Sequence, residues 1–201
     1  MLICTGADRR KLNVPGAKEF ENKGITYCAS CDGPLFTDKD VIVIGGGNAG
    51  FETAAQLLAY TKSVTLLHRS PEFKADQITV QKVLKNPKMK AITNAVTKEI
   101  KGEQFVTSLV YEDAESGQSY EIKTEGIFVE IGLVPATAFV GDFLEMTDYK
   151  QIVVDPKNQR ASQEGVWASG DCADGFFHQN NIAAGDAVKA LEDIYNYLHT
   201  K

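Results

Sequence analysis

The chain has 201 residues, and 43% of them are apolar, which is enough to bury a folded core. Its formal net charge is −6, and its 21 lysine and arginine residues form no basic block, so we expect no nucleic acid partner. No apolar run approaches the roughly 20 residues that span a bilayer, and the apolar part of "MLICTGADRR" is too short for a signal peptide. We therefore expect a cytoplasmic protein without membrane contact.

The first half of the chain predicts an α/β unit of the nucleotide-binding type. Residues 41–44, "VIVI", are wholly apolar and β-branched, as in a parallel strand that is covered on both faces. A glycine-rich turn follows at 45–50, then helical spacing over 51–60 and a second strand over 63–69. Together these segments predict a βαβ unit of about the usual 30 residues.

The rest of the chain predicts the completion of this domain and then a second segment. We expect a helix over 72–86 and strands over 88–113 and 120–132. A new segment begins near Pro135, where the strand pattern is interrupted. It ends in an expected helix over 181–198.

Cys28 and Cys31 in "YCASCDG" are separated by two residues, and Asp32 follows directly. A zinc site would need further ligands at short spacing, and the three histidines are scattered along the chain, so we expect no metal. Cytosolic thiols are kept reduced, so a CxxC pair beside a βαβ pattern indicates redox activity rather than a permanent bridge. Asp32 can carry protons as the pair opens and closes, or it can simply form a turn or helix cap before Gly33.

Gly45, Gly47 and Gly50 fit the G-x-G-x-x-G fingerprint, with a strand before it and a helix after it. The first glycine permits a tight turn, the second lets a pyrophosphate approach the backbone, and the third allows close packing of helix on strand. The helix N-terminus adds N–H groups and positive potential. A glycine-rich turn without a ligand is the alternative, and this structural context disfavours it.

The choice of nucleotide depends on the end of the second strand, His68-Arg69-Ser70, where NAD sites usually carry an acid. A guanidinium can bind a 2′-phosphate in bidentate fashion, so Arg69 favours NADP over NAD. A single arginine at a strand end can also be merely solvated, so the preference stays open. Because a flavin usually mediates between a nicotinamide and a disulfide, we also expect a flavin.

Several stretches together carry a resemblance to a known family: "CASCDG", "VIVIGGGNAG", "LLHRSPEFKAD", "GIFVEIGLVP" and "GVWASGDCAD" with the "HQNNIAAGDAVKAL" that follows. Over nearly its whole length the chain resembles the low-molecular-weight thioredoxin reductases, and it is also similar to the flavoprotein subunit of alkyl hydroperoxide reductase. The resemblance implies an α/β fold in which a Rossmann-like three-layer NAD(P)-binding domain is inserted into a partial FAD-binding domain. The implied boundaries are 1–10 for a remnant of the FAD-binding domain, 11–135 for the NADPH-binding domain with its CxxC centre, and 136–201 for the C-terminal part of the FAD-binding domain.

The resemblance also implies roles for single residues. Cys28 would attack the disulfide of the protein substrate, Cys31 would face the flavin, and Asp32 would be the general acid/base. The residues implied to hold NADPH are Gly45, Gly47, Asn48 and Gly50 at the pyrophosphate, and His68 and Arg69 at the 2′-phosphate. Family members often have a second arginine where this chain has Ser70, which weakens the expected preference for NADPH, and the peroxide-reductase relatives prefer NADH.

For FAD, the resemblance points to the end of a strand at "GVWASGD", the start of the last helix and the short motif "ICTGA". The residues concerned are Thr5, Gly6, Gly170, Asp171, Gln179 and Ile182. Asp171 would contact the ribityl or pyrophosphate part, and Gln179 and Ile182 would lie beside the isoalloxazine ring. Asp171 also suits a strand-end turn, and Gln179 also suits a plain helix start.

The chain departs from the family in having one glycine-rich loop, whereas family members begin with a separate FAD-binding βαβ unit that carries its own. We therefore expect unpaired strand edges near "MLICTG". The expected function is electron transfer from NADPH through FAD and the Cys28–Cys31 disulfide to thioredoxin or a similar small redox protein, in a homodimer. Two alternatives stay open: a truncated NADPH-binding module without turnover, and a flavoprotein that reduces a peroxiredoxin in an alkyl hydroperoxide reductase system.

Overall fold

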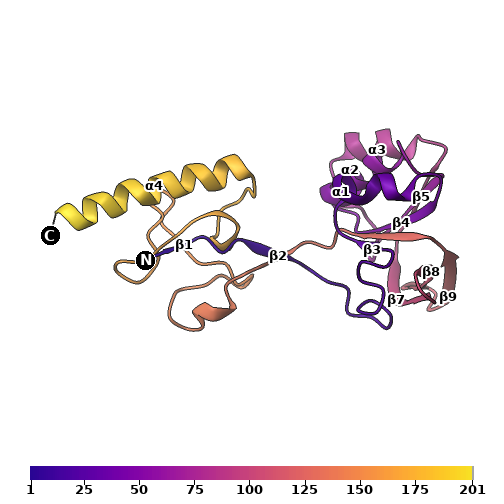
Figure 1. Ribbon diagram of the computed structural model, residues 1–201, viewed down its shortest axis with the longest axis horizontal. Coiled ribbons are helices and arrows are strands. Elements are labelled where there is room, and N and C mark those ends of the chain that lie inside the picture. The colour runs from indigo at the N-terminus through magenta and orange to yellow at the C-terminus, as the bar shows by residue number, and fades with distance from the viewer. Residues whose placement is uncertain (201) are drawn as a thin grey trace. The chain divides into compact units, whose positions relative to one another are not determined.

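The computed structural model describes residues 1–200, which form two compact units (Figure 1). One unit comprises Arg10–Ile131, and the other combines Met1–Arg9 with Gly132–Lys201. The first unit is therefore inserted into the second, and the chain passes between them twice. Among the described residues, no helix is long and apolar enough to cross a membrane.

A five-stranded parallel sheet forms the middle of the unit Arg10–Ile131. Its strands, in spatial order, are β3 (Ile25–Thr26), β10 (Gly126–Val129), β4 (Asp40–Ile44), β5 (Ser63–Leu67) and β6 (Met89–Ile92). The central strand β4 is buried along nearly its whole length, as its apolar run predicts. Ile44 is paired with Val129 on one side and Leu67 on the other, so the three strands end at the same edge of the sheet.

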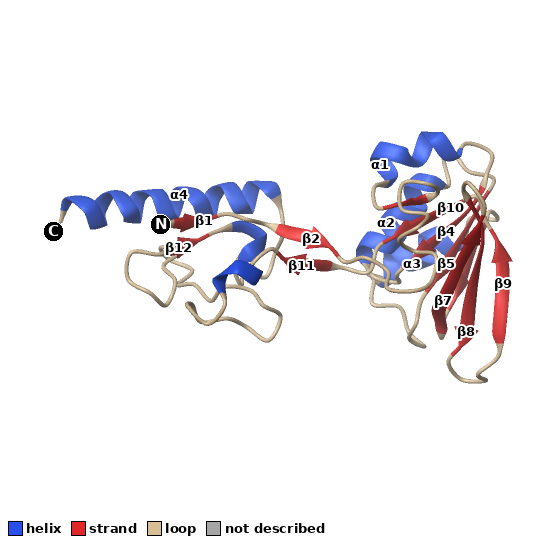
Figure 2. Cartoon of the chain, turned by 60° about the horizontal axis from the view of Figure 1, so that its bottom comes forward, coloured by secondary structure: helices blue, strands red, loops and turns tan. Residues whose placement is uncertain are grey.

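Helices cover one face of this sheet and a second sheet covers the other (Figure 2). Side chains alternate along β4, so Val43 packs with Phe51 on the helical side and Ile42 packs with Leu109 on the opposite side. The covering elements are α1 (Ala29–Asp32), the 3₁₀ turn η1 (Gly33–Phe36), α2 (Asn48–Leu57) and α3 (Gln77–Leu84) on one face, and antiparallel β7 (Ala95–Gly102), β8 (Val106–Asp113) and β9 (Ser119–Lys123) on the other. The predicted Rossmann-like arrangement of three layers is confirmed.

The helix predicted over 72–86 is wrong over residues 72–76, because α3 begins only at Gln77. Asp76 is its N-cap, and one carboxylate oxygen of Asp76 accepts a hydrogen bond from the N–H of Thr79 at 2.8 Å. Residues 72–76 lie against the glycine-rich loop instead, where the N–H of Lys74 donates to the carbonyl oxygen of Gly46 at 2.8 Å.

The second unit is built from two short strand pairs and one long helix. Parallel β1 and β12 form one pair and antiparallel β2 and β11 form the other. The elements are β1 (Leu2–Ile3), β2 (Ala7–Arg9), β11 (Leu133–Pro135), η2 (Ala138–Val140), β12 (Trp167–Ala168), η3 (Gly170–Cys172) and α4 (Asn180–His199).

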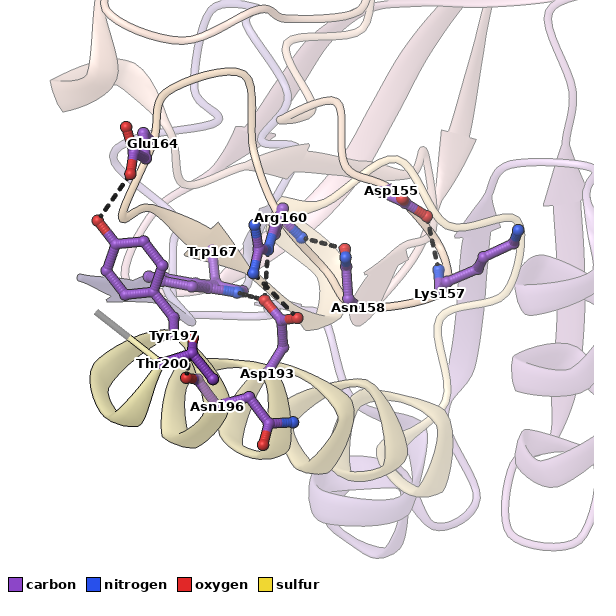
Figure 3. Close-up of polar contacts among 10 residues, drawn as sticks. All are labelled: Asp155, Lys157, Asn158, Arg160, Glu164, Trp167, Asp193, Asn196, Tyr197 and Thr200. Carbon is purple, nitrogen blue, oxygen red and sulfur yellow. Dashed lines mark hydrogen bonds and ion pairs between the residues drawn. The ribbon is translucent and has the colours of Figure 1, made fainter.

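A polar network around Asp193 fastens α4 to the rest of this unit (Figure 3). The Asp193 carboxylate accepts hydrogen bonds from the guanidinium of Arg160 and, at 2.8 Å, from the indole N–H of Trp167. One turn further along the helix, the hydroxyl of Tyr197 donates to Glu164 at 3.1 Å. The hydrogen bond from Arg160 holds the pKa of Asp193 below its usual value, and the hydrogen bond from Trp167 makes a smaller contribution in the same direction.

Replacing Asp193 by alanine is expected to lower the free energy of unfolding by about 1–3 kcal/mol, because it leaves the buried indole N–H of Trp167 without an acceptor. A lowered carboxyl pKa stabilises the fold above the ordinary aspartate value of 3.8, and this contribution is lost as the pH falls below it. The Asp193→Ala variant should therefore lose part of the acid dependence as well. Trp167 is the single tryptophan of the chain, so its fluorescence during urea unfolding reports on this network.

Lys189→Ala is the matched control for this prediction. Lys189 lies on the same helix, and its half-exposed ammonium group pairs with Asp186 at 2.9 Å and donates to the Pro156 carbonyl at 3.3 Å; a surface ion pair of this kind is worth less than about 1 kcal/mol. Equal destabilisation by the two variants would contradict the anchoring role of Asp193.

Candidate active site

Cys28 and Cys31 form a disulfide at the start of α1, with their Cα atoms 5.3 Å apart. Cys28 is the N-cap of this short helix, and the N–H of Cys31 is directed at the Cys28 sulfur at 3.1 Å. Cys28 is half-buried and Cys31 is exposed. When the disulfide opens, the N–H group would stabilise a thiolate on Cys28.

Asp32 follows the disulfide and is oriented by Thr26, a residue that the sequence pattern alone did not single out. Thr26 lies on β3, its side-chain hydroxyl donates to the Asp32 carboxylate, and the same oxygen accepts from the Cys28 N–H at 3.5 Å. Asp32 occupies the N-cap position of η1 but makes no capping hydrogen bond with its side chain. The carboxylate is therefore linked through Thr26 to the backbone N–H of Cys28 and is not used as a helix cap. A threonine two residues before a CxxC pair is the signal that could have revealed this contact.

Exposed side chains lie on η1, which follows the disulfide helix, and just after α2. Leu35 is 71% exposed, and Tyr60, also exposed, lies close to Gly33. The hydroxyl of Ser30 donates to the side chain of Gln56 on α2 at 3.0 Å, which ties the two helices together. A mixed apolar and polar surface of this kind suits contact with another protein.

The glycine-rich loop joins β4 to α2 and has the geometry of a dinucleotide cradle. Gly45 has φ +125°, and a Cβ on it would lie 2.0 Å from the carbonyl oxygen of Glu130. A Cβ on Gly50 would lie 1.8 Å from the carbonyl oxygen of Gly45, so the helix packs directly on the turn. A Cβ on Gly47 would meet nothing within 4 Å, which leaves open space at the N-terminus of α2. These residues fit a pyrophosphate.

The other residues predicted to contact the nucleotide lie beside this loop, and two of them use their side chains within the protein. The side-chain oxygen of Asn48 accepts from the N–H of Asp76 at 2.8 Å. The His68 ring is buried and both of its nitrogens have partners in the protein. Arg69 is exposed, next to the C-terminal end of β5.

In the second unit, the residues predicted to contact a flavin gather at one edge of the β1–β12 pair. Thr5 and Gly6 follow β1, and Gly170 and Asp171 follow β12. The two strand ends are adjacent, because the sulfur of Cys4 lies 3.1 Å from the hydroxyl of Ser169.

The start of α4 lies at the same edge. A Cβ on Gly170 would lie 3.3 Å from that of Ala183, and His178 lies 3.4 Å from the Asp171 carboxylate. Gln179 is the N-cap of α4 without a side-chain capping bond, and Ile182 is in its first turn. These residues could contact the ribityl chain and ring of a flavin, and the described part of this unit contains no G-x-G-x-x-G loop for its pyrophosphate.

Comparison with known proteins identifies the family. The profile of the pyridine nucleotide-disulphide oxidoreductase family matches residues 1–189, so the chain belongs to this family. It is 42% identical over 198 residues to a Bacillus subtilis protein named NADH dehydrogenase, and 39% identical over 198 residues to the F subunit of alkyl hydroperoxide reductase of Staphylococcus aureus. Each match covers 98% of this chain and 39% of the relative.

Solved structures confirm the predicted fold class. Thioredoxin reductase of Lactococcus lactis, in its FR conformation, superposes with a TM-score of 0.91 at 35% identity, over 100% of this chain and 66% of that one. Thioredoxin reductase of T. acidophilum gives a TM-score of 0.87 at 38% identity, over 98% of this chain and 64% of that one. The chain thus has a thioredoxin reductase-like α/β fold, and it spans about two fifths of the length of the curated relatives and just under two thirds of these structures.

Proposed function

We propose that the chain carries the redox and nucleotide-binding parts of an FAD-dependent disulfide oxidoreductase, which passes electrons from NADPH to thioredoxin or a similar small redox protein. The observation that carries this proposal is the Cys28–Cys31 disulfide with Asp32 beside it, in the same unit as the glycine-rich loop. In this proposal residues 11–135 form the NADPH-binding domain, and residues 1–10 and 136–201 belong to the FAD-binding domain of a cytoplasmic homodimer.

The two cysteines have distinct tasks in such a reaction. A bound pyridine nucleotide and flavin would supply two electrons, which together with two protons convert the disulfide into two thiols. Cys28 loses its proton and attacks one sulfur of the partner's disulfide, which gives a mixed disulfide and frees the partner's other sulfur. Cys31 then attacks the Cys28 sulfur, which restores the Cys28–Cys31 disulfide and releases the partner in its dithiol form.

Asp32 would take the proton from the attacking thiol and return it to the leaving sulfur. Its position supports this role, because Asp32 adjoins Cys31 in sequence and Thr26 fixes its carboxylate. The exposed Leu35 and Tyr60 would contact the partner protein.

A second candidate function is the reduction of a peroxiredoxin. The observation that favours it is the 39% identity to the F subunit of alkyl hydroperoxide reductase of Staphylococcus aureus. A third candidate function is an NADPH-binding module without turnover, and the observation that favours it is the glycine-rich loop, which leaves open space at the N-terminus of α2.

A turnover assay separates these functions. We expect the purified chain, supplied with FAD, to show flavin absorbance and to oxidise NADPH faster than NADH with thioredoxin as the acceptor. Because a hydrogen-bonded charge pair is worth about 1.5–3 kcal/mol, Arg69→Ser should raise the KM for NADPH roughly tenfold or more and leave that for NADH unchanged. Faster turnover with a peroxiredoxin would favour the second function, and nucleotide binding without turnover or flavin would favour the third.

A further inference from the structure

His68 is enclosed between the glycine-rich loop and the segment of residues 72–76. The ring is 8% exposed at the C-terminal end of β5. The N–H of Gly46 donates to Nδ1 of His68 at 3.1 Å, and Nε2 lies 2.9 Å from the carbonyl oxygen of Glu72. Since Nδ1 accepts a hydrogen bond and a carbonyl can only accept, the ring hydrogen lies on Nε2 and the imidazole is neutral.

Further contacts bind the same segment to the loop. The Lys74 N–H donates to the Gly46 carbonyl at 2.8 Å, so both backbone groups of Gly46 are bonded to this side of the molecule. Phe73 lies with its ring centroid 5.7 Å from that of His68 and 5.0 Å from that of Phe51 on α2. The His68 and Phe73 rings fill the space beside Gly46, where a Cβ would lie 2.5 Å from His68 Cγ.

A proton on Nδ1 would break the hydrogen bond from Gly46, because the ring would then present an N–H group to the N–H of Gly46. The surroundings of His68 disfavour its protonated form. Burial lowers the pKa of His68 most, the hydrogen bond to Glu72 raises it, and the positive charges of Lys74 and Arg69 lower it further. The glycine-rich loop carries no titratable side chain, and the neighbouring part of α2 presents Phe51.

We propose that His68 is a positioning residue, which in its neutral form holds Gly46 and with it the glycine-rich loop. Protonation of His68 releases the loop and weakens the binding of NADPH and NADH alike. This inference rests on the proposed use of the loop for a nucleotide. It differs from the expectation that His68 contacts the 2′-phosphate, because both ring nitrogens already have partners in the protein.

The two roles predict opposite effects of acid. As a phosphate ligand, His68 would strengthen NADPH binding when protonated and would leave NADH binding unchanged. If His68 is a positioning residue, its protonation would weaken the binding of both nucleotides. This happens at a pH below 6.5, the ordinary pKa of histidine, because the pKa of His68 is lowered. NADH decides between them, since it has no 2′-phosphate that titrates.

Nucleotide dissociation constants between pH 5 and 8 would test the proposal. For the unmodified chain we expect the Kd of both nucleotides to rise about tenfold towards the acid end, the size expected for losing one buried hydrogen bond. In His68→Asn the side-chain oxygen can accept from Gly46 and does not titrate, so the binding of both nucleotides should stay tight and NADH binding should lose its pH dependence. His68→Phe keeps an aromatic ring but removes the acceptor nitrogen, so it should weaken the binding of both nucleotides at every pH. Arg69→Ser should weaken the binding of NADPH alone. Tighter NADPH binding in acid with unchanged NADH binding would overturn the proposal.

A second measurement needs no nucleotide and separates this inference from the proposed function. In ¹⁵N NMR spectra of the full chain, His68 should show its hydrogen on Nε2, and the Gly46 amide shift should follow the titration of His68. A hydrogen on Nδ1, or a Gly46 amide that ignores the titration, would refute the positioning role even if nucleotides bind. If no nucleotide binds at any pH, the proposed function fails, and the spectra still decide the role of His68.

Discussion

Replacing Cys31 by serine is expected to reduce protein-disulfide turnover to the uncatalysed rate while leaving nucleotide affinity unchanged. The disulfide cannot form without the second sulfur, so Cys28 has no resolving partner after it has attacked a substrate. The close contacts of the glycine-rich loop are with Glu130, with His68 and Phe73, and within the loop itself, so the substitution does not touch it. Steady-state NADPH oxidation with thioredoxin and a nucleotide titration of the same preparation would test both parts.

The two single variants also test which sulfur attacks. In Cys31→Ser the remaining Cys28 thiol should be trapped as a stable mixed disulfide with the partner protein, visible on a non-reducing gel. Cys28→Ser should abolish turnover as well but should trap no partner. If only Cys28→Ser traps the partner, Cys31 is the attacking cysteine and the assigned roles are wrong; Cys31 is the more exposed of the two cysteines in this unit.

Cys4→Ser is the matched control for these variants. Cys4 is a free, exposed cysteine in the other unit, and its sulfur contacts the hydroxyl of Ser169. Turnover should be retained in Cys4→Ser. A loss comparable to that in Cys31→Ser would indicate that thiol chemistry is not confined to the CxxC pair.

Features that depend on residues close in sequence could be predicted. The run at 41–44 predicts a buried central strand because all its side chains are apolar, and β4 is that strand. The glycine spacing predicts a tight turn from strand to helix, and the structure shows that side chains at Gly45 and Gly50 would collide with backbone atoms.

Features that depend on competing local interactions could not be predicted. The apolar spacing over 72–86 does not show that Asp76 caps the helix and leaves the preceding residues to bind the loop. His68 stands at a strand end where a nucleotide contact is expected, and its actual partners, Gly46 and Glu72, are set by the path of that segment. The contact between Thr26 and Asp32 depends in the same way on how α1 turns back on β3.

The second large effect is expected at the glycine-rich loop, where two alanine substitutions should weaken nucleotide binding for different reasons. In Gly50→Ala the new Cβ would lie 1.8 Å from the carbonyl oxygen of Gly45, so the backbone has to move. Overpacking against a fixed backbone costs about 2–4 kcal/mol, which would lower the Tm of the unit Arg10–Ile131 by about 5–15 °C. Nucleotide binding should be lost with the loop geometry.

Gly47→Ala is the informative counterpart. Gly47 has φ −95°, and a Cβ there meets no protein atom within 4 Å, so the substitution should leave Tm within about 1 °C of the unmodified chain. The same Cβ would project into the space at the N-terminus of α2 that a pyrophosphate would fill, so nucleotide affinity should fall about tenfold or more. Calorimetry and a nucleotide titration on both variants separate folding from binding. If Gly47→Ala binds nucleotide normally, the pyrophosphate does not approach the loop at this glycine, and the cradle has to be sought elsewhere on the same sheet edge.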